Sequence, residues 1–173
     1  IPEDNGTTLE TIDTVTGEVS TIANAFEVSR YRRTCAVVGS KIYIPQNNGT
    51  TLEIIDTTTG AIETIENAFT SSRYRYTSAV VGSKLYITEY SGTALEIVDI
   101  ATGAVTTIAN AFAGARTRVT SAVVGSKICI PQDGVTALDI IDTATGAVET
   151  IANAFEVSRY RITSAVVGDK IYI

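Results

Sequence analysis

The stretch IDTTTGAIETI, residues 55–65, occurs four times in this chain with small changes. The other copies read IDTVTGEVSTI at 12–22, VDIATGAVTTI at 98–108 and IDTATGAVETI at 141–151. Neighbouring copies lie 43 residues apart, and self-similarity at a fixed period of this size is the signature of a repeat architecture. The 173 residues therefore form a single repeat array with units at about 1–43, 44–86, 87–129 and 130–173.

Each unit is predicted to contain four short strands separated by turn signals. One such set of four strands is predicted at 75–81, 84–87, 94–100 and 104–109, beginning in the second unit and ending in the third. The V-G-S-K and D-x-x-T-G connections are hairpins, because glycine tolerates positive φ and an aspartate accepts backbone N–H bonds at a turn. The structural turn residues of the second connection are Asp13, Asp56, Asp99, Asp142, Gly17, Gly60, Gly103 and Gly146. Each unit is thus expected to be an antiparallel four-stranded meander.

The strands carry continuous apolar runs such as AVV and IYI, which need cover on both faces. A meander of this size removes too little surface from water to offset roughly 1.5 kcal/mol of ordering entropy per residue, so it has to stack on its neighbours. Four-stranded units that stack face to face are the blades of a β-propeller. The predicted fold is therefore all-β, a propeller-type array of meander blades.

A family resemblance points the same way. TSAVVGSKLYI at 77–87, followed by LEIVDIATG at 95–103, resembles the kelch-type and YVTN-type propeller repeats, in which a "kiYv" strand precedes an "evyD-x-x-t" strand. The resemblance covers all four units and implies propeller architecture.

The array begins and ends at the same phase of the repeat, since Ile1 aligns with Ile173. We therefore expect three whole blades and two complementary half blades, at 1–29 and 159–173. Unpaired halves would expose bare strand edges, which is an aggregation hazard. Three arrangements remain open: the halves close into a four-bladed ring, the chain is a segment of a longer one, or each half pairs with a second molecule in a ring or filament.

Paired arginines are the most conspicuous polar feature. The pairs are Arg30 and Arg32, Arg73 and Arg75, Arg116 and Arg118, and Arg159 and Arg161. Residues two apart on a strand point to one face, so these guanidinium groups could form a ring that binds carboxylates or sulfated glycans. The alternative is a structural ladder of ion pairs with the recurring acids Glu10, Glu53, Glu96 and Asp139.

Little in the chain points to catalysis. There is no histidine, hence no Ser-His-Asp or Cys-His arrangement and no histidine metal site. Each D-x-x-T-G turn offers one carboxylate, too few for a calcium site, so we expect no metal, no cofactor and no catalytic residue. A second recurring set is expected to be hydrogen-bonding loop asparagines beside buried phenylalanines. This set comprises Asn24, Asn67, Asn110 and Asn153 with Phe26, Phe69, Phe112 and Phe155.

Composition and short motifs bear on location. A net charge of -6 and a pI near 4.6 argue against nucleic acid, and no apolar stretch approaches the roughly 20 residues that span a bilayer. Asn5 and Asn48 begin Asn-Gly-Thr sequons, which predict glycosylation and an extracellular or surface location. Cys35 and Cys129 stand where other units have serine and tyrosine, so we expect unpaired, largely buried thiols, with an intermolecular bridge as the alternative.

These features favour a non-enzymatic structural or adhesive protein whose main partner is itself. The competing hypothesis is a propeller module that binds an anionic glycan or a protein through its arginines. A propeller-type hydrolase or lactonase is the weaker alternative.

Overall fold

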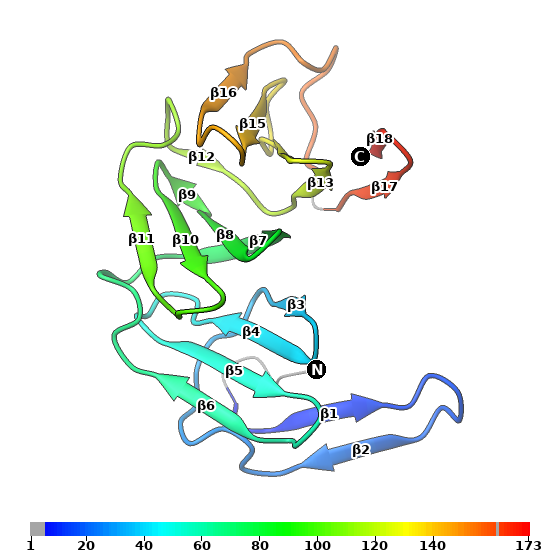
Figure 1. The fold of residues 1–173 in the computed structure, drawn as a ribbon. Coiled ribbons are helices and arrows are strands. Elements are labelled where there is room, and N and C mark those ends of the chain that lie inside the picture. Colours follow the sequence, from blue (N-terminus) through cyan, green and yellow to red (C-terminus); the bar gives the residue numbers. More distant parts are fainter. Residues whose placement is uncertain (1–5, 162) are drawn as a thin grey trace.

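The computed structural model describes residues 6–161 and 163–173, and their regular structure consists of β-strands. Within that part of the chain no helix is long and apolar enough to cross a membrane. The strands form antiparallel sheets that repeat along the chain (Figure 1). The all-β prediction is confirmed.

Three sheets contain four strands each, in the order in which the chain visits them. The first consists of β3 (Ala36–Val38), β4 (Lys41–Pro45), β5 (Leu52–Asp56) and β6 (Ile62–Ile65). The second consists of β7 (Arg75–Val81), β8 (Lys84–Glu89), β10 (Leu95–Asp99) and β11 (Val105–Ile108). The third consists of β13 (Ala122–Val124), β14 (Lys127–Pro131), β15 (Leu138–Asp142) and β16 (Val148–Ile151). The predicted antiparallel meander is thus confirmed, and β7 has the predicted bounds.

The remaining sheets have two strands each. At one end of the array β1 (Leu9–Ile12) pairs with β2 (Val19–Ile22), and at the other end β17 (Ala165–Val167) pairs with β18 (Lys170–Tyr172). A short pair, β9 (Ser91–Gly92) and β12 (Arg116–Thr117), links the second sheet to the chain that enters the third.

The D-x-x-T-G hairpins owe their shape to the aspartate. In the second copy Asp56 accepts bonds from the backbone N–H of Thr58 (2.9 Å) and Thr59 (3.2 Å), and Gly60 has a φ of 74°. These backbone N–H bonds lower the pKa of Asp56 below its ordinary value, and the same bonding lowers the pKa of the equivalent aspartates. Asp13, Asp99 and Asp142 accept the same pair of backbone N–H bonds in their own hairpins.

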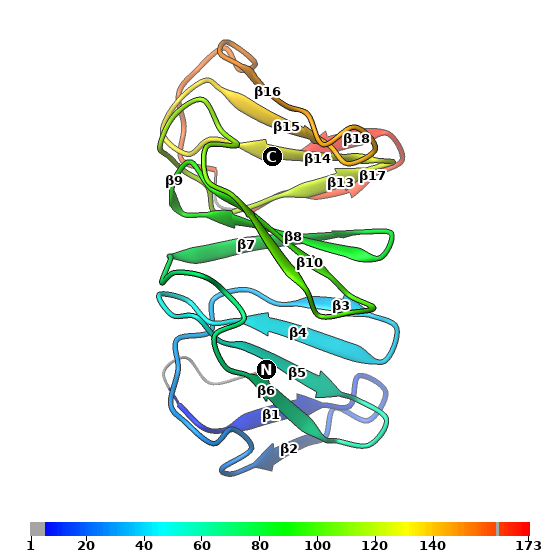
Figure 2. The same cartoon turned by 60° about the vertical axis from the view of Figure 1, so that its left-hand side comes forward.

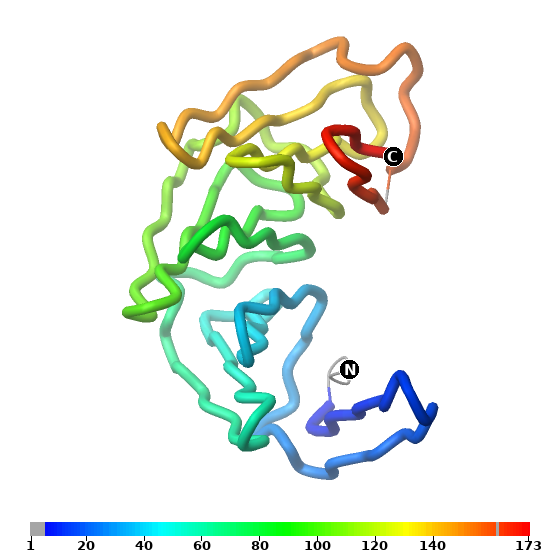
Figure 3. Tube along the Cα trace, turned by 45° about the vertical axis from the view of Figure 1, so that its right-hand side comes forward, coloured from blue at the N-terminus to red at the C-terminus, as the bar shows by residue number. Residues whose placement is uncertain are grey.

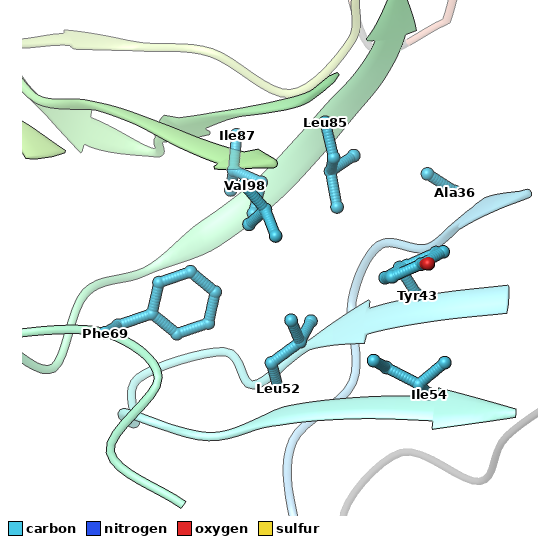
Figure 4. Packing of buried hydrophobic residues seen from close by; sticks show 8 residues of the cluster. All are labelled: Ala36, Tyr43, Leu52, Ile54, Phe69, Leu85, Ile87 and Val98. Carbon is cyan, nitrogen blue, oxygen red and sulfur yellow. The ribbon is translucent and has the colours of Figure 1, made fainter. Parts of the chain in front are cut away.

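The hydrophobic core lies between consecutive sheets rather than within one of them. Tyr43 and Leu52 of the first sheet pack with Leu85 and Val98 of the second, and Phe69, from the connection between the sheets, closes one side of the cluster (Figure 4). An equivalent cluster joins the second and third sheets, and a smaller one joins β1–β2 to the first sheet. Mutual cover by neighbouring units is therefore how these apolar strands are buried.

The sheets stack in a curved row that does not close on itself (Figures 1 and 2). First strands contact first strands along the row, β3 with β7, β7 with β13 and β13 with β17, and they lie toward the concave side. The tube view shows an open crescent with β1–β2 and β17–β18 at its two tips (Figure 3). The two end sheets therefore do not pair with each other, and the chain does not close into a four-bladed ring.

Candidate functional site

The second arginine of each pair lies in a buried cluster. Arg75, at the start of β7, has no exposed surface, and its Nε and Nη2 atoms both donate to the carboxylate of Glu96 on β10, with Nη2 at 2.7 Å from Oε1. Glu96 is 2% exposed. The forked geometry of guanidinium matches a carboxylate, and charge-assisted bonds of this kind are the strong ones. The ion pair joins the first and third strands of one sheet.

The remaining donors of Arg75 reach loops of the preceding sheet. Nη1 donates to the carbonyl oxygens of Gly49 (2.6 Å) and Gln46 (3.0 Å), and Nη2 donates to that of Ser71 (3.0 Å). The guanidinium also lies 3.9 Å from the ring centroid of Phe69, within cation–π range. A single side chain thus ties the start of one sheet to the loop of the sheet before it.

The same arginine cluster recurs once per unit. Arg32 binds Glu53 and the carbonyls of Gly6 and Val28, and it lies 3.8 Å from the Phe26 ring. In the third unit Arg118 binds Asp139 (2.7 Å) and the carbonyls of Gly92 and Gly114, over Phe112. Burial lowers the pKa of Arg118 below its ordinary value, while the charge of Asp139 acts in the opposite direction.

The fourth cluster is incomplete within the part of the chain that the structure describes. Arg161 donates to the carbonyls of Val135 (2.9 Å) and Val157 (2.8 Å), and it stacks at 4.0 Å on Phe155. In the other units the acid lies 21 residues after the arginine, a position that for Arg161 would fall past residue 173. No ion pair joins Arg161 to a carboxylate of residues 6–161 or 163–173.

The first arginines of the pairs differ from unit to unit. Arg30 donates to Gln46 (3.3 Å) and pairs with Glu66, and Arg73 pairs with Glu89 (3.0 Å). Arg116 and Arg159 are exposed. A uniform ring of eight accessible guanidinium groups is therefore not present, because Arg32, Arg75 and Arg118 are buried and bound to protein acceptors. For these three, the ladder of ion pairs is the alternative that the geometry matches.

Arg116 lines a small pocket of about 250 Å³. Arg73 pairs with Glu89, and the residue one period after Glu89 is Gln132. Arg30 pairs with Glu66, and the residue two periods after Glu66 is Ala152. Both replacements are uncharged, and both line the pocket with Arg116. The third unit therefore has a cavity where the first two have a carboxylate.

The other predicted residues have structural surroundings. Asn24 and Asn67 have positive φ and accept long bonds from threonine hydroxyls, while Phe26, Phe69 and Phe112 are buried. Asn48 is exposed on a turn, and Asn5 lies outside the described residues. No group of three or more potential metal ligands occurs among the described residues.

The two cysteines form no disulfide with each other. Cys35 is exposed on the chain before β3, whereas Cys129 is buried in β14, where burial raises the pKa of its thiol. Both thiols are unpaired, as expected, but only Cys129 has the expected burial; Cys35 is exposed because it precedes β3 and no sheet covers it.

Hydroxyl groups link the first strands on the concave side. Thr34 bonds to Ser78 (2.8 Å), Thr77 to Ser121 (2.9 Å) and Thr120 to Ser164 (2.9 Å). Each serine hydroxyl also donates to a backbone carbonyl 43 residues earlier, and that of Ser78 binds the carbonyl of Cys35. We call this row the hydroxyl ladder; with one contact per interface, it follows the same period as the arginine clusters.

Sequence reasoning missed both the hydroxyl ladder and the aromatic and carbonyl contacts of the clusters. The signal for the aromatic contact was present, because a phenylalanine precedes the second arginine by six residues in every unit. The carbonyl acceptors carry no such signal, since any residue supplies a backbone oxygen.

Comparison with known proteins bears on the fold. No protein-family model matches the sequence, and no curated protein matches it. Among solved structures, the chain is similar to BamB from Moraxella catarrhalis, a β-propeller, with a TM-score of 0.64 and 16% identity over 96% of this chain and 48% of that one. It is also similar to Kuenenia stuttgartiensis hydrazine synthase, with a TM-score of 0.56 and 18% identity over 73% of this chain and 35% of that one.

The chain thus spans about half the length, or less, of the solved structures it matches. At these identities the likeness concerns the fold alone. Together with the stacked four-stranded meanders, it identifies the architecture as propeller-like.

Proposed function

We propose that this chain is a non-enzymatic structural or adhesive protein, extracellular or at the cell surface, that assembles head-to-tail with copies of itself. In this proposal the three four-stranded sheets are whole blades of the kelch or YVTN type. The β1–β2 and β17–β18 pairs are half blades, and each half is completed by the opposite half of another molecule.

One observation carries the proposal: equivalent residues are buried inside the array and exposed at its tips. Ile12 on β1 is 51% exposed, whereas Ile55, Val98 and Ile141, one to three periods later, are 4%, 0% and 0% exposed. At the other tip, Tyr172 is 57% exposed, whereas Tyr43 and Tyr86 inside the array are 3% and 5% exposed. Burying the exposed half of a single isoleucine is worth about 1 kcal/mol, and open strand edges add unpaired backbone groups that favour pairing with another chain.

Light scattering over a dilution series, combined with negative-stain images, tests this function. The chain is expected to form multi-chain species, and Ile12→Lys is expected to reduce them because it places a charge on the contact face. Val15→Lys is the matched control, since Val15 is 94% exposed in a turn of the same half blade. Dispersed monomers at every concentration would refute the proposal.

An extracellular location is supported by the sequon at Asn48, which is exposed on a turn. Mass spectrometry of the protein recovered from its native source is expected to find a glycan at Asn48 that Asn48→Gln removes. An unmodified Asn48 in protein from that source would remove this support for the location.

A second candidate function is favoured by the pocket at Arg116. Its exposed guanidinium, with Gln132 beside it, suits a carboxylate or a sulfate group of a glycan. Calorimetric titration with a sulfated disaccharide is expected to give binding that Arg116→Ala abolishes. Arg73→Ala is the control, because Arg73 already faces Glu89, and its loss should leave the titration unchanged.

A further inference from the structure

A tyrosine marks the difference between the interior of the array and its C-terminal tip. Tyr43 and Tyr86 are 3% and 5% exposed, and each packs against the sheet that follows. Tyr172, at the same place in the last unit, is 57% exposed. In the interior, the tyrosine belongs to the same buried cluster as Leu85 and Val98 of the next sheet (Figure 4).

The opposite tip carries a groove of matching position. The groove, about 510 Å³ in volume, lies between the β1–β2 half blade and the first whole sheet, and Leu9, Ile42, Ile55 and Thr57 are among its lining residues. Leu9, Ile42 and Ile55 lie one period before Leu52, Leu85 and Val98, the residues that surround Tyr43. The groove is therefore equivalent to the site that Tyr43 occupies one period later, and no tyrosine precedes Leu9 in this sequence to fill it.

A polar contact in the interior supports the same equivalence. Burial raises the pKa of Tyr86, and the side chain of Thr143 lies close enough to its hydroxyl to oppose that shift. Thr143 stands two periods after Thr57, so the groove already holds the hydroxyl partner that a buried tyrosine needs.

The charges at the two tips are complementary. In the whole sheets Lys41 pairs with Asp56 in the strand register, and the same pairing recurs at Lys84 and Asp99 and at Lys127 and Asp142. The C-terminal tip presents Arg161 and Lys170, whereas the N-terminal tip presents Glu10 and Asp13 at the positions of the acids that face these cations in whole sheets. The two tips thus continue the interface between successive sheets.

We propose that the groove is filled by the β17–β18 half blade of a second copy, in the register of the whole sheets, and that two copies close into one ring. This inference rests on the proposed function and specifies its junction. The number of copies is argued from the extent of the structural match. The chain aligns over 96% of its length with 48% of BamB, and a propeller is a closed ring of blades, so two copies of this chain have the length that one ring of that size requires.

The register fixes the contacts across each junction. Tyr172 of one copy enters the groove between Ile42 and Ile55 of the other. Arg161 meets Glu10, and Lys170 lies opposite Asp13. The hydroxyl ladder continues as well, because Thr163 takes the place of Thr34, Thr77 and Thr120, and the residue it meets is Cys35 of the second copy.

A disulfide across the ladder tests this register directly. The variant Thr163→Cys, in a Cys129→Ser background, places a thiol beside the native Cys35 of the second copy. On mild oxidation it is expected to give a covalent dimer with both junctions closed and no free thiol left. Adding Cys35→Ser to that variant should leave it without this crosslink.

An interior pair verifies that the ladder geometry accepts a disulfide. Thr77→Cys with Ser121→Cys, in a background without the native cysteines, is expected to form the bond within one chain, since these hydroxyls lie 2.9 Å apart. Disulfides need side chains that face each other at short range.

The outcomes separate this inference from the function it rests on. A ladder of trimers and longer species would overturn the two-copy ring while the head-to-tail function stands. Multi-chain species without crosslink, alongside a bonded interior pair, would overturn the proposed register. Monomers throughout would overturn both.

A second variant tests the groove. Tyr172→Asp is expected to weaken association of the two copies on the order of tenfold or more, as loss of an aromatic anchor does at interfaces. Tyr160→Asp is the control, because Tyr160 is 85% exposed and lies outside the strands. Equal association of the two variants would overturn the role of the groove.

Discussion

The Arg75 guanidinium is charged, fully buried and bound to Glu96 as well as to carbonyl oxygens in loops of the preceding sheet. Removing one partner of such a pair leaves the other charge buried and uncompensated, which costs about 3–5 kcal/mol. Arg75→Met is therefore expected to lower the free energy of unfolding by that amount in urea titrations. The free energy of unfolding of Arg75→Lys should lie between those of the original chain and Arg75→Met, because lysine keeps the positive charge but cannot make the forked pair of hydrogen bonds.

Arg116→Met is the matched control for this prediction. Arg116 is exposed, and surface substitutions usually change stability by less than about 0.5 kcal/mol. Equal losses for Arg75→Met and Arg116→Met would contradict the structural role of the cluster.

The turn aspartates predict how stability depends on pH. Backbone N–H bonds lower the pKa of Asp56 in the folded chain below its ordinary value of 3.8. A depressed pKa contributes stability that is complete above the unfolded value and is lost as the pH falls through the folded value. The midpoint temperature of thermal unfolding is therefore expected to decrease when the pH drops below about 4. Asp56→Asn should make this decrease smaller. An unchanged pH profile in the variant would argue against this source of acid sensitivity.

At the scale of the element, the V-G-S-K hairpin between β7 and β8 depends on a left-handed residue. Gly82 has a φ of 59°, and no atom lies within 4 Å of a Cβ built there, so the backbone alone sets the cost of a substitution. Gly82→Ala is expected to lower the free energy of unfolding by about 1–2 kcal/mol.

Gly114→Ala is the control with the opposite sign. Gly114 does not have positive φ, and its added Cβ would meet only the Arg116 Nε at 4.0 Å. Alanine at such a position stabilises by about 0.4–1 kcal/mol, because the unfolded chain loses freedom. Thermal unfolding of the two variants should therefore shift in opposite directions, and shifts of the same sign would contradict this account of the hairpin.

At the scale of the whole molecule, the described sheets contact one another in sequence, through β3 with β7, β7 with β13 and β13 with β17, so stability is close to a sum of units and interfaces. Deleting residues 87–129 removes one period and joins Tyr86 to Ile130 in register. The shortened chain is expected to remain all-β by circular dichroism, with a denaturant slope about a quarter smaller, since that slope scales with the surface exposed on unfolding.

Deleting 87–126 serves as the control because it breaks the register by three residues. The strand after the deletion would meet its neighbours out of phase, with apolar side chains facing water. This variant should fail to fold cooperatively. If it unfolded like the in-register deletion, the importance of the period would be disproved.

The sequence was informative about what is periodic and local. The spacing of Gly82 and Gly125 placed the hairpins, and alternating turn signals placed β7 to its exact bounds. The sequence did not distinguish a ligand-binding ring of arginines from a ladder of ion pairs, because the exposure of each arginine depends on which part of the fold covers it. Arg75 and Arg116 carry the same side chain, yet one is buried by the preceding loop and the other borders a pocket.

The clusters of Arg32, Arg75 and Arg118 each take carbonyl acceptors from one repeat and a carboxylate from the next repeat. Unequal crossing-over between two copies of the repeat in the gene would add or drop a whole copy, and each surviving cluster would still find all its groups. Protein length could therefore drift in the course of evolution without changing a single contact. The size of an assembly would then be inherited as a number of repeats, not as the identity of any residue.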